Sequence, residues 1–423
     1  MSTAKPGDTV QLTTDTKTYE GILMPRPEIY EKGITVLKLP TGYNLGISDK
    51  KITKTTVITK YSEPKQKTVT HTHNKNLPTV AILSCGGTIA SKLDYRTGGV
   101  VGKYTADDFI AMMPELLDIA NITSEAVSET MSEDMAYADW KLIANAIYKQ
   151  LQDDSIKGVV VTCGTDSLHY ISAALSFFLQ DINKPVIITA AQRSIDRGSS
   201  DAFLNLICAT KAACEFNGTL VSVCMHETTN DDSCILMRGS KVRKMHTSRR
   251  DAFRPINEQP LARITPNEIT IINKNYPSTP NTKPTRATDF EEKIGLVYVH
   301  PLMQASEIDI YVQNKYKGLV VAGTALGHVP KQLVAPLAKA KKAGLHIIIC
   351  SQTLYGRTHP FVYSRLREQS IKHKFFFAQD ILPEVALVKL GWALGQSTTV
   401  ESLFEKNICG EYTTEIDERS FLL

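Results

Sequence analysis

The sequence has 423 residues and lacks the features of a membrane protein, a secreted protein or a disordered chain. No uncharged apolar run approaches the ~18 residues of a membrane-spanning helix, and the N-terminal residues lack the apolar core of a secretory signal. Glycine and proline contribute only 24 and 19 residues, too few for a fibrous repeat or a low-complexity chain. We therefore expect a globular, cytoplasmic protein that makes no contact with a membrane.

Paired cysteines and a strong excess of charge are also missing. The eight cysteines form no Cys-x-x-Cys pair and mostly lie in apolar stretches, so buried reduced thiols are expected rather than disulfides or zinc ligands. The 48 basic and 44 acidic side chains leave a net charge of +4, too small for a protein that holds nucleic acid by charge alone. We expect no metal site, and any contact with RNA must be local or made through a partner.

The N-terminal part is rich in short runs of β-forming residues. Residues 1–60 contain several such runs separated by turn signals, which predict a small β-barrel. Residues 61–77 are polar, with little to bury, and predict a linker. A first, small domain is therefore expected to precede the rest of the chain.

Residues 78–275 repeat one pattern, in which an apolar β-branched run is followed by a short Gly/Ser/Thr loop and a helical stretch. The apolar runs are 79–83, 158–162, 185–189 and 219–224. Between the first two, four side chains share one face of a helix: Trp140, Ile143, Ile147 and Leu151. Apolar strands that alternate with helices predict a parallel sheet covered on both faces, with ligands bound beyond the carboxyl ends of its strands.

A second polar segment, rich in proline, follows at residues 276–290 and predicts another linker. The strand and helix pattern then resumes on a smaller scale in residues 291–423. The predicted fold class is therefore α/β, with an N-terminal small β-barrel followed by a large α/β domain and a smaller C-terminal α/β domain.

Two loops of the large domain share the same character. Residues 84–91 read Ser-Cys-Gly-Gly-Thr-Ile-Ala-Ser, and residues 162–168 read Thr-Cys-Gly-Thr-Asp-Ser-Leu. In each loop glycine permits a sharp turn, a threonine hydroxyl follows, and free N–H groups can face a negative group or an oxyanion. The first loop has neither the GxGxxG nor the P-loop spacing, which disfavours a nucleotide-binding loop.

A threonine hydroxyl is a weak nucleophile until a partner takes its proton. Asp166 and Lys244 can provide that partner, because a partly desolvated lysine beside an aspartate and other cations loses its proton more readily than a free lysine. Lys244 lies in the basic, polar stretch 237–253, which does not look like a core element. On its own, this stretch favours a solvated basic loop or an RNA-contacting patch.

Short motifs along the chain resemble, in order, those of the bacterial-type L-asparaginase family. They are Gly-Gly-Thr-Ile-Ala at 86–90, Gly-Thr-Asp-Ser at 164–167, Ala-Gln-Arg at 191–193 with Ser-Asp at 200–201 and Asn-Leu at 205–206, and Val-Arg-Lys-Met-His-Thr at 242–247. The resemblance covers residues 79–423 and implies an asparaginase-like fold there. Four longer segments are similar to one branch, the GatD subunits of archaeal glutamyl-tRNA(Gln) amidotransferases, which also have an N-terminal β-rich domain. These segments are 225–232, 241–254, 354–357 and 381–389.

The resemblance implies a catalytic role for five residues. Thr88 matches the threonine taken as nucleophile in the family, and Tyr95 matches the flap tyrosine that helps to deprotonate it. The second hydroxyl, the carboxylate and the amine of a linked triad are matched by Thr165, Asp166 and Lys244. The amide-hydrolysing chemistry of the family is therefore expected at these positions.

Substrate contacts are implied in the same way. Ser132 matches a serine that holds the α-carboxylate of the substrate, Asp166 would also face its α-amino group, and Ala191 matches a residue whose main chain faces the scissile amide. Two positions depart from the family pattern: Cys163 replaces a common histidine, and Ser167 replaces a common threonine. Neither change removes a group from the proposed proton path.

The function implied by the resemblance is that of the glutaminase subunit of a tRNA-dependent amidotransferase. It would release ammonia from glutamine or asparagine, and a partner resembling GatE of these enzymes would use ATP and Mg²⁺ to convert Glu-tRNA(Gln) into Gln-tRNA(Gln). The chain itself would need no cofactor. It would form a homodimer through its asparaginase-like part within a heterotetramer, and would contact tRNA(Gln) mainly through the partner.

Two alternatives stay open. A free-standing L-asparaginase would release ammonia to solvent. Residues 1–76 argue against it, because simple amide hydrolysis requires no function of them. A non-catalytic RNA- or protein-binding scaffold is the second alternative. It is disfavoured because the chain retains all four main catalytic candidates: Thr88, Thr165, Asp166 and Lys244.

Overall fold

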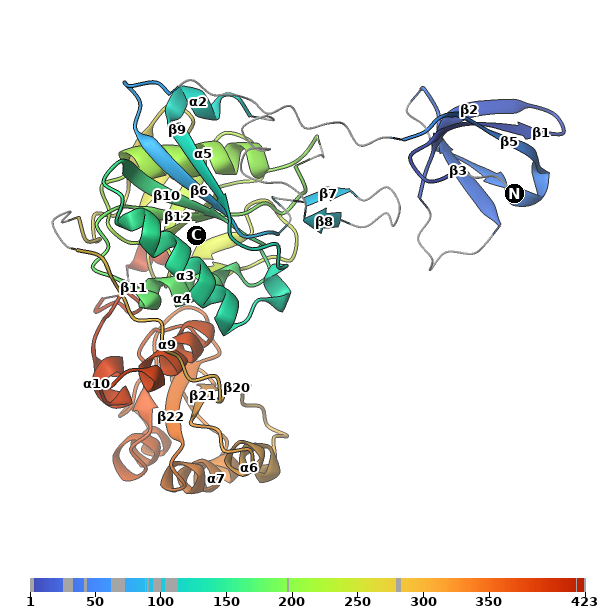
Figure 1. Cartoon of the computed structure of the whole chain (residues 1–423). Coiled ribbons are helices and arrows are strands. Elements are labelled where there is room, and N and C mark those ends of the chain that lie inside the picture. The colour runs from blue at the N-terminus through green and yellow to red at the C-terminus, as the bar shows by residue number, and fades with distance from the viewer. Residues whose placement is uncertain are drawn as a thin grey trace.

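The computed structural model shows three parts in chain order, an N-terminal sheet, a large α/β domain and a small α/β domain (Figure 1). The predicted fold class is thereby confirmed. The structure describes residues 4–25, 33–41, 44–61, 73–87, 89, 91–93, 100–102, 113–195, 198–278, 283–415 and 417–421.

The N-terminal part is a five-stranded antiparallel sheet with the order β4-β3-β2-β1-β5. Its strands are β1 (Thr9–Thr14), β2 (Thr18–Leu23), β3 (Ile34–Lys38), β4 (Asn44–Ser48) and β5 (Ile52–Thr59). The sheet curls around a small core formed by Val10, Leu12, Leu37 and Ile47. In the described part of this domain β4 and β5 are not paired, so no hydrogen-bonded ladder closes the barrel.

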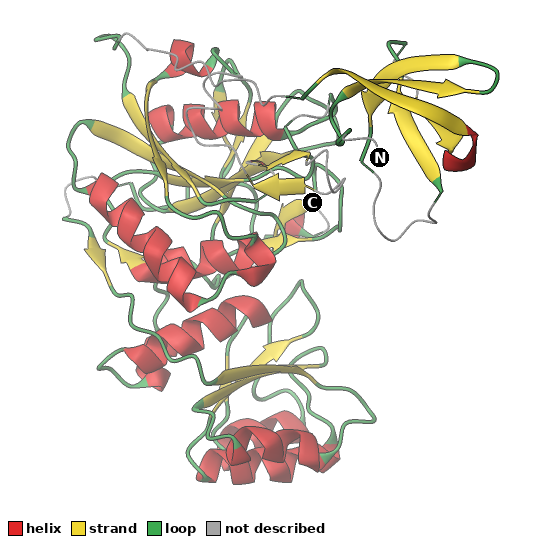
Figure 2. Cartoon of the chain, turned by 45° about the vertical axis from the view of Figure 1, so that its right-hand side comes forward, coloured by secondary structure: helices red, strands yellow, loops and turns green. Residues whose placement is uncertain are grey.

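The large domain is built on an eight-stranded sheet with the order β18-β17-β14-β13-β12-β10-β6-β9. Five neighbouring strands are parallel, as predicted. They are β6 (Thr79–Ser84), β9 (Asn121–Ala126), β10 (Ile156–Thr162), β12 (Val186–Thr189) and β13 (Val221–His226). Helices cover both faces of the sheet (Figure 2), as burial of its two apolar faces requires. These helices are α3 (Tyr137–Leu151), α4 (Leu168–Phe178) and α5 (Ala202–Glu215).

The remaining edge of this sheet is antiparallel, and its strands were not predicted from the sequence. Its strands are β14 (Cys234–Arg238), β17 (Ala262–Ile264) and β18 (Ile269–Ile271). The chain between β13 and β14, residues 227–233, is too short for a crossover helix, because a parallel connection needs a dozen or more residues. A short loop returns the chain in the opposite direction instead.

The basic stretch 237–253 does not look like a core element in the sequence. This interpretation was wrong for its two ends, residues 237–242 and 251–253, which are buried, whereas residues 245–249 are exposed. Within it β15 (Val242–Lys244) pairs with β16 (Phe253–Pro255), and the side chains of Val242 and Phe253 are fully buried. Lysine and arginine stems are apolar, so such residues can be buried where carboxylates meet their charged ends. Asp380 meets Lys241 in this way.

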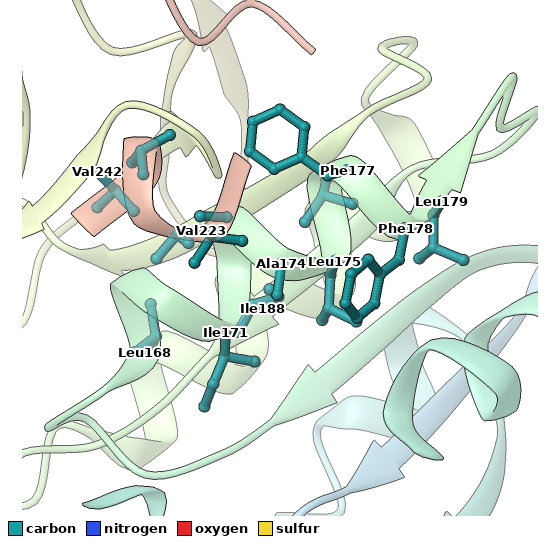
Figure 3. Close-up of a cluster of buried hydrophobic side chains, with 14 of the residues drawn as sticks. Leu168, Ile171, Ala174, Leu175, Phe177, Phe178, Leu179, Ile188, Val223 and Val242 are labelled. Atoms are coloured by element: carbon teal, nitrogen blue, oxygen red, sulfur yellow. The ribbon is translucent and has the colours of Figure 1, made fainter. Parts of the chain in front are cut away.

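Helix α4 joins the two α/β domains. It is buried along nearly its whole surface and packs between the large sheet and helix α9 (Pro383–Gly395) of the small domain. Figure 3 shows its side chains, among them Phe177 and Phe178, in one cluster with Ile188, Val223 and Val242. The core of the large domain thus continues across the domain junction.

The small domain has a four-stranded parallel sheet with the order β20-β21-β22-β23. These strands are β20 (Ile294–Tyr298), β21 (Gly318–Gly323), β22 (His346–Ser351) and β23 (Phe376–Phe377). Helices α6 (Ala305–Gln313) and α7 (Lys331–Lys342) cover one face, and α9 covers the other (Figure 2).

Shorter elements connect these layers. The helices are α2 (Leu116–Ile119), α8 (Ser364–Arg367), α10 (Val400–Glu405), the 3₁₀ turns Asp49–Lys51, Ser132–Asp134 and Glu418–Ser420, and the π turn Glu368–Lys372. The strands are β7 (Ser91–Leu93), β8 (Val100–Gly102), β11 (Leu179–Gln180) and β19 (Thr285–Arg286). In the described ranges no helix combines the length and the apolar character needed to cross a bilayer.

The cysteines are free thiols, and seven of the eight are buried, which confirms the burial predicted for them. Burial raises the pKa of Cys163 to about 12 and also raises that of Cys85. Both thiols are therefore protonated at neutral pH and are poor nucleophiles. The two cysteines that precede the glycine loops thus have a packing role.

Helix α5 packs closely on the sheet at Gly158 of β10. A Cβ atom at this position would lie 2.2 Å from the carbonyl oxygen of Ala213. We expect Gly158→Ala to lower the free energy of unfolding by about 1–3 kcal/mol, as overpacking of a core does. Gly198→Ala is the control, because its Cβ would meet no atom within 4 Å. Urea unfolding of both variants checks this, and equal stabilities would contradict it.

Candidate active site

Four loops meet at one edge of the large sheet. Strands β12, β10, β6 and β9 are neighbours and run parallel, so the loops that follow their carboxyl ends lie side by side. These loops carry Ala191, Thr165, Gly87 and Ser132, in that order across the sheet. The sheet order therefore gathers residues that lie far apart in the sequence.

Glycine allows three of these loops to touch. Gly86 and Gly87 have φ angles of +74° and +81°, in the left-handed region that favours glycine. A Cβ on Gly87 would lie 2.2 Å from the backbone nitrogen of Gly164, and a Cβ on Gly164 would lie 2.5 Å from Ser132 Oγ. No other residue type fits at these contacts, so the loops after β6, β10 and β9 pack backbone against backbone.

Lys244 of β15 reaches the loop after β10. Its Nζ atom donates to Thr165 Oγ1 at 3.0 Å and to Asp166 Oδ1 at 2.6 Å. The Lys244 side chain is only 10% exposed, whereas that of Asp166 is 63% exposed. The structure thus brings together the three residues of the predicted triad, with a shielded amine and a carboxylate open to an incoming molecule.

Ser132 lies beneath this triad in a 3₁₀ turn after β9. Its Oγ accepts a hydrogen bond of 3.2 Å from the backbone N–H of Asp166, and its carbonyl oxygen accepts a short one from Ser167 Oγ. A hydroxyl that accepts such a bond can still donate its own proton, as binding of a carboxylate requires. Ser167, one of the two departures from the family pattern, therefore supports the same loop contact.

The loop that contains Ala191 is held by a residue to which the sequence assigned no role. Asp201 is fully buried, and its carboxylate accepts from the N–H groups of Gln192 and Arg193, each at 3.0 Å. Asn205 donates to the carbonyl oxygen of Ala190 at 2.9 Å. These bonds hold the main chain on both sides of Ala191. Asp201 and Asn205 both lie in short motifs that resemble the asparaginase family, and these motifs were the signal by which the sequence could have indicated them.

His169 is a second residue that the sequence did not single out. It lies near the start of α4, and burial, followed by the charges of Arg243 and Lys244, lowers its pKa to about 3. A neutral histidine adds no positive charge to this side of Lys244. The role is electrostatic and depends on the fold, so no local sequence pattern indicates it.

Two predicted site residues, Thr88 and Tyr95, lie outside the described residues, and their roles stay predictions. Gly87, which precedes Thr88 in the chain, is described and contacts the loop that carries Thr165. In the part of the chain that the structure describes, no group of three or more His, Cys, Asp or Glu side chains could hold a metal ion. The chemistry open to the described residues is that of hydroxyl, carboxylate and amine groups.

Three family models match consecutive parts of the chain. The GatD N-terminal domain matches residues 4–58, the N-terminal asparaginase domain matches 79–277, and the glutaminase/asparaginase C-terminal domain matches 293–405. Among solved structures, the thermostable L-asparaginase from Thermococcus kodakarensis is similar, with a TM-score of 0.70 and 26% identity. The match covers 80% of this chain and 100% of that one.

Curated relatives match nearly the whole chain. The glutamyl-tRNA(Gln) amidotransferase GatD of Methanobrevibacter smithii is 43% identical over 98% of this chain and 96% of its own length. The GatD of Pyrococcus furiosus is 42% identical over 96% of this chain and 93% of its own length. The resemblance inferred from short motifs is thereby confirmed. The chain belongs to the GatD family of glutamyl-tRNA(Gln) amidotransferase subunits, in which an N-terminal domain precedes an asparaginase-like part.

Proposed function

We propose that the chain hydrolyses the side-chain amide of glutamine, or of asparagine, at the edge of the large sheet where Thr165, Asp166 and Lys244 meet. It is the glutaminase subunit of a tRNA-dependent amidotransferase. The contact of Lys244 Nζ with both Thr165 Oγ1 and Asp166 Oδ1 carries this proposal. An amine held between a hydroxyl and a carboxylate can accept and return a proton during acyl transfer.

The reaction proceeds in two steps. In the first, the Thr88 hydroxyl attacks the amide carbon, its proton passes to the amine group of Lys244 or through Tyr95, and ammonia leaves with the proton that it needs. An acyl-enzyme ester on Thr88 results. In the second step, water attacks this ester, releases glutamate or aspartate, and restores the threonine hydroxyl.

Three groups orient the substrate in this proposal. The carboxylate of Asp166 faces the α-amino group, and its exposure agrees with contact to an incoming cation. The hydroxyl of Ser132 binds the α-carboxylate, and the main chain at Ala191 faces the scissile amide. The support from Asp201 and Asn205 keeps that main chain in place, as an oriented contact in acyl transfer requires.

The ammonia is consumed by a partner. A chain resembling GatE would activate the glutamate on tRNA(Gln) with ATP and Mg²⁺ and would accept the ammonia, so the tRNA would be held mainly by that partner. This chain uses only side chains and water and needs no cofactor of its own. We further propose a cytoplasmic heterotetramer, built on a homodimer of the asparaginase-like part.

A free-standing asparaginase is the alternative that the likeness to solved asparaginases would favour by itself. The N-terminal domain argues against it, because the match to the solved asparaginase covers 80% of this chain and all of that one. The GatD relatives match over nearly the full length. A non-catalytic scaffold is disfavoured by the assembled triad.

Replacing the proposed nucleophile should stop the reaction. We expect Thr88→Ala to abolish glutamine hydrolysis and the acyl-enzyme, because no other group at that position can form the ester. Rapid quenching followed by mass spectrometry of the peptide that contains residue 88 checks the intermediate. Thr270→Ala, at an exposed position of β18, is the control. An acyl group found on Thr165 instead would assign the attack to the other threonine.

Replacing the proposed base should slow the reaction while the charge is kept. We expect Lys244→Arg to reduce kcat by about 10²-fold or more, because arginine stays protonated and cannot accept the proton. Lys157→Arg, at an exposed position of β10, is the control. An active Lys244→Arg variant that binds tRNA more weakly would show that Lys244 is a phosphate contact instead.

Removal of the N-terminal domain should affect the formation of Gln-tRNA(Gln) but not the hydrolysis of glutamine. We expect a chain without residues 1–76 to hydrolyse glutamine at the basal rate, because every described catalytic candidate lies in the asparaginase-like part. Formation of Gln-tRNA(Gln) with GatE should fall, since the domain then no longer contributes to assembly. Assays of both reactions check this, and an undiminished yield of Gln-tRNA(Gln) would contradict it.

A further inference from the structure

Residues 241–244 contact both domains of the asparaginase-like part. Lys244 extends toward Asp166 of the large domain. Arg243, its neighbour in β15, extends toward α9 of the small domain, as expected because successive side chains of a strand point to opposite faces. Lys241 also reaches the small domain. The segment that carries the proposed base is therefore held from behind by residues of the small domain.

The first attachment is the ion pair of Lys241 and Asp380. Lys241 Nζ lies 2.5 Å from Asp380 Oδ2, and the two side chains are 1% and 0% exposed. Asp380 also accepts hydrogen bonds from the backbone N–H and the hydroxyl of Thr413, at 2.9 Å and 2.8 Å. A buried carboxylate with this many partners has one position, so it holds the start of the segment firmly.

The second attachment is the ion pair of Arg243 and Glu384, in the first turn of α9. A guanidinium nitrogen of Arg243 lies 2.6 Å from Glu384 Oε1, and Glu384 is fully buried. Apart from this ion pair, neither Glu384 oxygen has a hydrogen-bond partner in the described part of the chain. The charge of Arg243 and the positive end of α9 are what stabilise this carboxylate.

Three groups around Glu384 have raised pKa values. Burial, and then the charge of Glu384, raises the pKa of Tyr170 on α4 and of Tyr298 on β20. For Arg243, burial opposes the charged form, but Glu384 outweighs it and the pKa is raised. The charged guanidinium of Arg243 therefore faces Glu384 directly behind Lys244.

We propose that Glu384 is a positioning residue for Lys244: its ion pair with Arg243 holds β15 so that the Lys244 amine reaches Thr165 and Asp166 only when the small domain is seated against the large one. This inference rests on the proposed role of Lys244. Contacts that shift the small domain, including those of a partner protein, would then change the rate of amide hydrolysis through β15.

The size of the expected effect follows from the geometry of proton transfer. A reacting group displaced by about 1 Å can lose roughly 10²-fold in rate. The substrate contacts proposed for Ser132 and Ala191 lie on other loops. Asp166 contacts Lys244, but its backbone N–H is held by Ser132 Oγ, so the substrate-binding loops keep their main support when β15 shifts. Loss of Glu384 should therefore lower kcat by about 10-fold to 10²-fold and change KM by less than about 3-fold.

The pH dependence of kcat distinguishes a positioning role of Glu384 from a purely structural one, because loss of stability alone would not shift it. In Glu384→Gln the charge of Arg243 has no counter-ion, and a nearby positive charge favours the neutral form of a lysine. The other groups that face Arg243 and Lys244 are Asp166, the neutral His169, Tyr170 and Tyr298. All of them remain in the variant. The limb of the kcat profile that reports Lys244 should therefore move to lower pH.

The experiment compares Glu384→Gln with Glu411→Gln in the full-length chain. Glu411 forms a fully buried ion pair of 2.5 Å with Lys389 inside the small domain. Among the described residues, its hydrogen bonds go to Lys389 and to the N–H groups of Ile408 and Cys409 rather than to residues 241–244. Both variants should lose thermal stability, because each leaves a buried cation without its counter-ion. Only Glu384→Gln should lower kcat and shift the profile. Equal kcat values and profiles in the two variants would overturn the proposal.

Glu384→Asp covers the case in which Glu384→Gln does not fold. Aspartate keeps the charge but is one methylene shorter, so kcat should fall while the pH profile keeps its position. A wild-type kcat in Glu384→Asp would overturn the proposal. Lys244→Arg separates this failure from that of the proposed function. If the Lys244→Arg variant stays active, Lys244 is not the base. If it is inactive while the Glu384 variants keep the wild-type kcat, only the positioning role fails.

Discussion

The backbone contact between Gly87 and Gly164 is the constraint on which the candidate site depends. A Cβ atom on either residue would overlap the neighbouring loop. The loops after β6 and β10 can therefore come this close only because both positions are glycine. Parallel pairing of these strands then sets the two loops level with each other. The loop that carries Thr165 and the loop that carries Gly87 thereby meet at one place on the edge of the sheet.

The nature of the available groups decides the chemistry at this edge. Cys85 and Cys163 precede the two glycine loops, yet burial raises the pKa of both thiols and removes them as nucleophiles. Hydroxyl groups remain, and they need a base. In the proposed reaction this base is Lys244, which lies on a different element, β15, at hydrogen-bond distance from Thr165 and Asp166. The amine of a lysine is useful here because, unlike arginine, it can lose its proton.

Buried ion pairs at the domain junction connect this chemistry to the rest of the fold. Burial of a charge costs free energy that an apolar contact does not, so such pairs are a weak source of stability. They do specify orientation, because each charge has one acceptable partner. In this chain Lys241 and Arg243 find their carboxylates on the segment around the start of α9, and the orientation so defined is that of β15. This gives the small domain a defined influence on the large one.

The sequence by itself determined the fold class, the order of the domains and most of the elements. The apolar runs became β6, β10, β12 and β13, and the helix with Ile143, Ile147 and Leu151 on one face is α3. Local patterns suffice for such elements, because burial of a face leaves a period of two or 3.6 in the residues. The motifs also indicated Thr165, Asp166 and Lys244, which the structure brings together.

Only the tertiary structure decided the antiparallel edge of the large sheet, the burial of residues 237–242 and 251–253 in the basic stretch, and the neutral state of His169. These features depend on partners that are distant in the sequence: Lys241 and Asp380, for example, are separated by 139 positions. A lysine in a polar stretch looks the same in the sequence whether it is solvated or paired. Its environment is set by the packing of two domains, because the electrostatic free energy of a charge depends on the groups around it in space.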